Sequence, residues 1–348
     1  MITTDSIRQQ LATVKYPGFS RDIVSFGLVK DIVITGTEVV VQMSMSTADA
    51  SVPRQIKEAA EAALAALPGV TSALVRIDIT APQQQPMGAQ SMPQTSIPGV
   101  KHIIAIASGK GGVGKSTVAA NLACALAATG ASVGLCDCDL YGPSVGIMFG
   151  ANERPFADED NRIIPLERYG LKLMSMGFLL DDDAPAILRG PMVTKYTQQF
   201  LRQVEWGDLD YLVLDLPPGT GDIQLTIVQT VALAGAVIVT TPQEVALLDA
   251  RKAVTMFQKV NVPVLGLVEN MAYFQCPSDG VRYDIFGSGG GEREATRQKV
   301  PLLGQIPIDI PTRESGDRGK PITAAEPDSA IAQVFVSIAQ KLRQIVGY

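Results

Sequence analysis

The sequence has 348 residues, of which 46% are hydrophobic and 18% charged, and a formal net charge of −6. This length predicts about two domains with a large core, and the acidic balance gives no support for nucleic acid as a main partner. The N-terminus lacks the basic and apolar pattern of a signal peptide, and the longest apolar run, Val231 to Val239, is about half a membrane span. Four cysteines are too few for a disulfide framework. We therefore expect a cytoplasmic protein without a membrane partner.

Residues 1–81 predict a small two-layer α/β domain. Helical apolar spacing alternates with stretches in which every second residue is apolar, and a Thr-Gly turn separates the first two such strands. An Ala-rich stretch forms the second expected helix and stops at Pro68-Gly69. The expected order is α-β-β-α-β, with elements at 5–14, 28–34, 38–45, 52–67 and 72–79.

Residues 82–99 predict an extended linker. No charged residue lies between Asp78 and Lys101, and the stretch between them holds four prolines and five glutamines. Such a composition buries little apolar surface and resists helix formation. The linker therefore separates the small domain from the rest of the chain.

Residues 100–348 predict a second α/β domain with a mostly parallel sheet flanked by helices. Its strands are nearly continuous apolar runs, such as HIIAIAS, YLVLDL and GAVIVTT, and helical stretches separate several of them. Strands buried on both faces have this composition, because helices cover both sides of a parallel sheet.

A Gly-rich loop after the first of these strands predicts a nucleotide site. Residues 109–116 satisfy the pattern G-x-x-x-x-G-K-[ST] between a strand and a helix. The glycines let backbone amides surround phosphate oxygens, and the helix N-terminus adds partial positive charge. In this pattern Lys115 reaches the β- and γ-phosphates and the Ser116 hydroxyl binds Mg²⁺. The expected nucleotide-binding residues of the loop are Gly109, Lys110, Gly111, Gly112, Val113, Gly114, Lys115, Ser116 and Thr117.

Polar residues at the ends of three later strands extend this site. Asp139 lies just beyond the second strand, after Asp137 at its tip, and Asp215 ends the strand before Pro-Pro-Gly. In P-loop folds such carboxylates hold Mg²⁺, usually through water, although capping of a strand end is an alternative role. Asn270 ends another strand without the Lys and Asp of a guanine-reading motif, so it favours hydrogen bonding to adenine and ATP as the nucleotide.

Eight sequence motifs follow one another along the chain in this order: SGKGGVGKST, CDCDLYGPS, RGPM, WGDLDYLVLDLPPGTGD, TTPQEVALLDARKAVTMF, VENMAYF, DIFGSGGGE and LGQIPIDIPTRESGDRGKPI. From about Lys101 to Ile322 the chain resembles the Mrp family of P-loop ATPases, which are regarded as iron–sulfur cluster carriers. The N-terminal part, with RDIVSFGLVKDIVI and LPGV, resembles the small iron–sulfur-assembly domain often fused ahead of them.

The resemblance implies a role for Lys110, the second lysine of the loop. In this class of ATPase two subunits face each other across their nucleotides, and the extra lysine crosses to the partner's phosphates. It then acts as a cation supplied in trans when a homodimer closes; a solvated loop lysine is the alternative. The expected catalytic residues of a slow, Mg²⁺-dependent ATPase are Lys110, Lys115, Asp139 and Asp215.

The chain departs from the family where a cluster would bind. Family members usually carry Cys-Pro-x-Cys after the NMxYF segment, and the pair supplies four thiolates across a dimer. Here the sequence reads Cys276-Pro277-Ser278-Asp279, and the small domain also lacks its usual cysteine after the second strand. Cys276 is thus either a cluster ligand, with Asp279 as an oxygen donor that suits a cluster poorly, or an ordinary loop residue.

Two functions remain open from the sequence. One is an ATP-hydrolysing carrier or assembly factor that delivers iron–sulfur clusters to apoproteins, with iron–sulfur assembly proteins as further partners. The other is a nucleotide-switched dimeric scaffold that has lost cluster binding. Three cysteines, Cys124, Cys136 and Cys138, are expected to be buried, and the last helix is expected to pack against the sheet rather than bind a membrane. Arg189 of the RGPM stretch matches the family without a physical account of its role.

Overall fold

A computed structural model describes residues 3–15, 22–24, 27–46, 51–80, 96–179 and 201–347. The chain divides into two compact units, Met1–Gln90 and Ser91–Tyr348. Most of the expected linker and Arg189 lie outside the described residues.

The N-terminal unit is a three-stranded sheet with two helices, in the expected order α-β-β-α-β. Strand β2 is central; it pairs antiparallel with β1 and parallel with β3. Val39, Val41 and Met43 alternate along β2 and are buried together with Ile7 and Leu64 of the helices. The elements are α1 (Thr4–Leu11), β1 (Val29–Thr35), β2 (Glu38–Ser46), α2 (Ser51–Ala65) and β3 (Ser72–Thr80).

The larger unit contains an eight-stranded sheet in the order β13-β10-β9-β4-β8-β5-β7-β6. Neighbouring strands run parallel, except that β6 is antiparallel to β7. The mostly parallel sheet predicted from the apolar runs is therefore confirmed. The strands are β4 (Val100–Ala107), β5 (Val133–Asp137), β6 (Leu166–Arg168), β7 (Leu171–Ser175), β8 (Leu209–Asp215), β9 (Gly235–Thr240), β10 (Val264–Glu269) and β13 (Leu302–Gln305).

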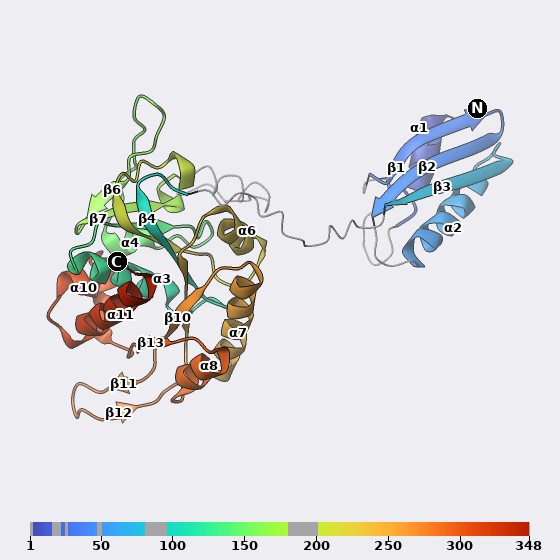
Figure 1. The fold of residues 1–348 in the computed structure, drawn as a ribbon. Helices are drawn as coiled ribbons and strands as arrows, with labels where there is room; N and C mark the ends of the chain where they lie inside the picture. The colour runs from blue at the N-terminus through green and yellow to red at the C-terminus, as the bar shows by residue number, and fades with distance from the viewer. Residues whose placement is uncertain are drawn as a thin grey trace. The chain divides into compact units, whose positions relative to one another are not determined.

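Helices cover both faces of this sheet, with α6, α7 and α8 on one side and α3, α10 and α11 on the other (Figure 1). This double cover explains why central strands such as β5 and β9 are buried along their whole length. The remaining elements are α3 (Lys115–Ala128), α4 (Val145–Phe149), a 3₁₀ turn (Met176–Leu179), α6 (Asp222–Thr230), α7 (Glu244–Lys259), β11 (Phe274–Gln275), β12 (Arg282–Tyr283), α8 (Gly290–Gln298), α9 (Ile310–Asp317), α10 (Ile322–Ala325) and α11 (Ala330–Val346).

The last helix, α11, packs against α3 and β13, as its apolar face predicts. Ile331, Phe335 and Leu342 are buried in the core. The spacing of apolar residues in this helix predicts that Ile345 shares the buried face, but Ile345 is 44% exposed, and the buried face includes two alanines instead. Ile345 lies in the last turn of the helix, which ends at Val346.

The topology brings three strand ends together. Strand β4 is central, β8 lies beside it, and β5 lies on the far side of β8. Asp137 at the end of β5 is the register partner of Asp215 at the end of β8. Because parallel strands end at one edge of the sheet, the loop after β4 and these carboxylates lie at the same edge, where ligands bind in open α/β sheets.

Candidate nucleotide site

The loop from β4 to α3 has a backbone that glycine alone fits at two positions. Gly114 has φ 78°, and a Cβ atom there would lie 2.2 Å from Nδ2 of Asn270. A Cβ atom on Gly109 would lie 2.0 Å from the carbonyl oxygen of Asp249 in α7. The loop therefore lies tightly between α7 and the end of β10, with its shape fixed by close contacts to a backbone carbonyl and to a side-chain amide.

Asn270 supports the loop from behind. Its side-chain Nδ2 donates a hydrogen bond of 2.9 Å to the carbonyl oxygen of Val113, and its backbone amide donates to Thr240. The residue is buried. The amide expected to read adenine thus holds the loop in this structure, and its contact with a base stays a prediction.

Lys115 and Asp215 form a buried ion pair at the centre of the site. The Lys115 ammonium donates to Oδ1 of Asp215 and, at 3.2 Å, to the Ser116 hydroxyl. The lysine side chain is 6% exposed and the aspartate is fully buried. Burial raises the pKa of Asp215, and the adjacent ammonium opposes that shift. The two residues expected to bind phosphate and Mg²⁺ therefore form an ion pair with each other.

One oxygen of this pair stays unsatisfied. Oδ2 of Asp215 is buried and has no hydrogen-bond partner in the described parts of the chain. Buried carboxylate oxygens are normally hydrogen-bonded or bound to a cation. Together with the nearby Ser116 hydroxyl, this oxygen fits the donor set that Mg²⁺ prefers.

The loop after β5 is organised by Asp137, which the sequence analysis placed at the strand tip but gave no role. Its Oδ2 accepts hydrogen bonds from the backbone amides of Ser144 (2.8 Å) and Val145 (3.1 Å) and from the Ser175 hydroxyl (3.2 Å). Burial, followed by the nearby Asp215, raises the pKa of Asp137 to about 6. Asp137 thus shapes the loop that carries Asp139.

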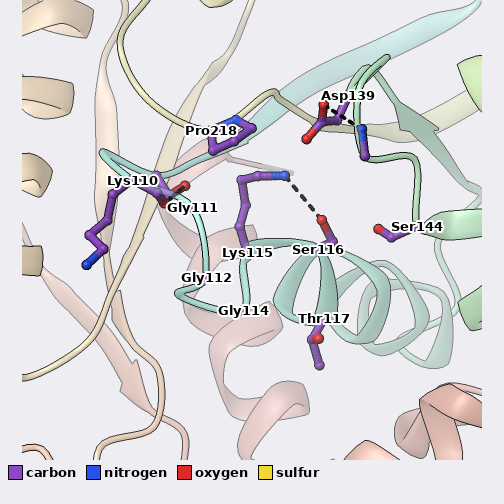
Figure 2. Close-up of a pocket in the computed structure, with 12 residues that line it drawn as sticks. Lys110, Gly111, Gly112, Gly114, Lys115, Ser116, Thr117, Asp139, Ser144 and Pro218 are labelled. Carbon is purple, nitrogen blue, oxygen red and sulfur yellow. Dashed lines mark hydrogen bonds between the residues drawn. The ribbon is translucent and has the colours of Figure 1, made fainter. Parts of the chain in front are cut away.

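Asp139 lines the pocket itself. Its Oδ1 accepts from the amides of Tyr141 and Gly142, both at 3.2 Å, which fixes the carboxylate at the pocket edge. The cavity has a volume of about 240 Å³. Figure 2 shows its lining, which consists of Ser108, Lys110, Gly111, Gly112, Gly114, Lys115, Ser116, Thr117, Asp139, Gly142, Ser144 and Pro218.

Gly142, Ser144 and Pro218 are lining residues that the sequence analysis did not select. They lie in the stretches LYGPS and LPPGTGD, which directly follow Asp139 and Asp215. The sequence feature that could have identified them is their position directly after two strands that end at the same edge of the sheet.

Lys110 differs from Lys115 in direction. Figure 2 shows its side chain pointing away from Lys115, while its backbone carbonyl accepts a 2.9 Å hydrogen bond from Ser108. It forms no ion pair within the ranges that the structure describes. The side chain is thus not engaged by its own pocket.

Cys276 lies in the loop of the short β11–β12 hairpin and is partly exposed. Its Sγ lies 3.0 Å from the Ser278 hydroxyl, and Oδ1 of Asp279 accepts from the Val281 amide at 2.9 Å, which lowers the pKa of Asp279. No group of three or more His, Cys, Asp or Glu side chains in the described residues is arranged to hold a metal ion. The other three cysteines are buried, as expected, with Cys136 and Cys138 sulfurs 3.8 Å apart.

The segment that carries this hairpin is anchored by Glu269, a fully buried residue that the sequence analysis missed. Oε1 of Glu269 accepts from the Gly291 amide (2.6 Å), and Oε2 accepts from Gln305 (2.5 Å). Glu269, which directly precedes the hairpin segment, thus also binds Gly291, which follows it. Glu269 is the neighbour of Asn270, which supports the loop.

A mostly parallel sheet whose central strand runs through a Gly-rich loop into a helix, with carboxylates on neighbouring strand ends, defines a P-loop NTPase domain. Comparison with family models gives the same class: residues 99–343 match the model described as NUBPL iron-transfer P-loop NTPase. The chain belongs to this family, which confirms the resemblance found in the sequence. Residues 4–75 match the model of an iron-sulfur cluster assembly protein.

Relatives of known sequence and structure agree. The chain is 47% identical over 348 residues to an iron-sulfur cluster carrier protein of Synechocystis, covering 98% of this chain and 97% of the relative. An iron-sulfur cluster carrier protein of Aquifex aeolicus is 56% identical over 76% of this chain and 72% of its own length. A nucleotide-binding protein of Archaeoglobus fulgidus, solved in complex with ADP and with Co, is 40% identical and has a TM-score of 0.60, over 68% of this chain and 92% of its own.

None of the helices in the described parts of the chain is both long and apolar enough to cross a membrane.

Proposed function

We propose that this chain binds and hydrolyses Mg-ATP and uses the cycle to carry iron–sulfur clusters to apoproteins. The observation that carries the proposal is the buried Lys115–Asp215 pair beneath a glycine-constrained phosphate loop. A desolvated ammonium and a carboxylate with one unsatisfied oxygen are costly to bury, and binding of phosphate and Mg²⁺ would satisfy both. The family membership supports the cluster as cargo.

The pocket residues have distinct roles in the proposal. Lys115 and the loop amides hold the phosphates, Ser116 and Asp215 hold Mg²⁺, and Asp139 orients the attacking water. When bound, Mg²⁺ supplies positive charge that stabilises the charge developing on the phosphate oxygens. Lys110 extends from the loop to a second subunit, so that turnover requires a homodimer.

A second candidate function is a nucleotide-switched scaffold that recruits protein partners without a cluster. One observation favours it: the second thiol position of the hairpin is Asp279, whose carboxylate already accepts a hydrogen bond from Val281. Two thiolates across a dimer form a weaker site for a soft cluster than four. Anaerobic reconstitution with iron and sulfide, followed by iron counting per dimer, distinguishes the two candidates.

Nucleotide binding is tested by titrating a fluorescent ATP analogue into the wild type and Lys115→Ala. We expect affinity to fall by at least about 100-fold, because the phosphates lose a desolvated charge partner. The matched control is Lys101→Ala, which removes a lysine whose 2.8 Å ion pair with Asp210 is 70% exposed on the lysine side. Wild-type affinity in Lys115→Ala would contradict the site assignment.

A further inference from the structure

Ser144 occupies the N-cap position of α4, but its side chain does not cap the helix. Serine at this position usually accepts a hydrogen bond from an amide of the first turn, as Ser329 does from Ala332 at the start of α11. Ser144 makes no such bond. Its backbone amide instead donates to Asp137, so the residue is held by its main chain while its side chain stays available.

The Ser144 hydroxyl lies in the phosphate pocket without a hydrogen bond to the described residues. It is buried, and among the residues that the structure describes it has no hydrogen-bond partner. Native proteins rarely leave a buried hydroxyl unpaired, so such a group calls for an absent partner. Ser144 lines the same cavity as Ser116 and Asp139, and Figure 2 shows its hydroxyl on the side that faces Ser116.

The position of this hydroxyl suits a hydrated cation better than a phosphate oxygen. The loop amides and Lys115, which attract phosphate, lie on the opposite side of Ser116 from Ser144 (Figure 2). Mg²⁺ takes oxygen ligands and keeps several waters when it binds a protein. A neutral hydroxyl both donates and accepts, so it can bind such a water whichever way that water is turned.

We propose that the Ser144 hydroxyl holds a water of the divalent cation bound by Ser116 and Asp215, and so positions the hydrated cation against Asp139. This inference rests on the proposed function, since it requires a complex with Mg²⁺ and nucleotide. Ser144 is a positioning residue, because it acts through the water and does not touch the nucleotide.

The test is a Mg²⁺ titration at a fixed concentration of a fluorescent ATP analogue. Ser144→Ala should need about tenfold more Mg²⁺ than the wild type for half-maximal binding, as is usual for loss of an outer-shell partner of a metal. Its affinity for the analogue in EDTA should equal that of the wild type. Ser144→Thr keeps the hydroxyl and should retain a Mg²⁺ requirement close to that of the wild type.

Ser329→Ala is the matched control. It removes a serine that does cap its helix, so it should lower the melting temperature and leave the Mg²⁺ requirement unchanged. Ser144→Ala should leave the melting temperature unchanged and raise the Mg²⁺ requirement, because its hydroxyl makes no hydrogen bond to the described residues.

Three results would overturn the inference. They are an unchanged Mg²⁺ requirement in Ser144→Ala, a loss of its affinity in EDTA, which would indicate contact with the nucleotide itself, and a loss of folding, which would indicate a structural role. A wild type that binds no nucleotide under any condition would instead contradict the proposed function, so the two failures are distinguishable.

Discussion

The phosphate pocket and the Cys276 hairpin are built in opposite ways. The pocket collects groups from the ends of three long buried strands, and its central ion pair is almost completely shielded from water. The hairpin consists of two strands of two residues each, with a partly exposed thiol at its turn. The framework of one chain therefore brings together the residues of the pocket, whereas the hairpin carries one thiol, so that a cluster bound there would need further ligands from elsewhere.

The difference between the two regions would disappear in part if Lys110 acts on a second chain, because the pocket would then also depend on that chain. We expect Lys110→Ala to lower the rate of ATP hydrolysis by about 1,000-fold, the scale of a cation supplied in trans. Affinity for ATP in one subunit should change little, since this side chain points away from Lys115. Steady-state hydrolysis and nucleotide titration measure the two effects separately. Unchanged hydrolysis would show that the pocket is complete within one chain.

Two glycines with positive φ, one in each region, test whether an added side-chain atom destabilises the two regions to different extents. A Cβ atom on Gly114 (φ 78°) would meet Asn270, whereas one on Gly280 (φ 71°) in the hairpin would meet none of the described residues within 4 Å beyond its chain neighbours. We expect Gly280→Ala to cost about 1 kcal/mol from backbone strain alone, and Gly114→Ala to cost about 3 kcal/mol, because overpacking adds to that strain. Urea unfolding of both variants gives the free energies, and equal costs would show that the loop does not lie as tightly as described.

Asp279→Cys changes the hairpin and leaves the pocket as it is, so it tests the ligand supply of the hairpin by itself. The substitution restores a second thiol, so two chains would supply four soft ligands to a cluster. We expect the iron retained per dimer after anaerobic reconstitution to rise roughly twofold, with slower loss to a chelator. Cys276→Ala should hold no iron at this position. If neither the wild type nor Asp279→Cys binds iron, the scaffold function is favoured.

Features that depend on residues close together in the sequence could be predicted from it. The strand–loop–helix pattern around Lys115 located the phosphate loop, and the apolar strands indicated a parallel sheet. Strand ends also gave Asp139 and Asp215, because a carboxylate after a buried run marks the sheet edge.

Contacts between distant strand ends could not be predicted in this way. The pairing of Lys115 with Asp215 and the support of Val113 by Asn270 depend on the order of strands in the sheet, which local patterns do not encode. Ser144 had no assigned role in the sequence, and only the structure shows that its amide binds Asp137 while its hydroxyl has no partner among the described residues.

The Lys115–Asp215 pair has a consequence for how tightly nucleotide can bind. Under the proposed function, Asp215 would act as a tethered competitor of phosphate for the Lys115 ammonium, because its concentration near the ammonium does not fall on dilution. The apparent dissociation constant for nucleotide would then be the intrinsic constant divided by the fraction of chains in which the lysine is free. Under the proposed function, a cation that engages Asp215 removes this competitor, so Mg²⁺ and nucleotide each strengthen the binding of the other.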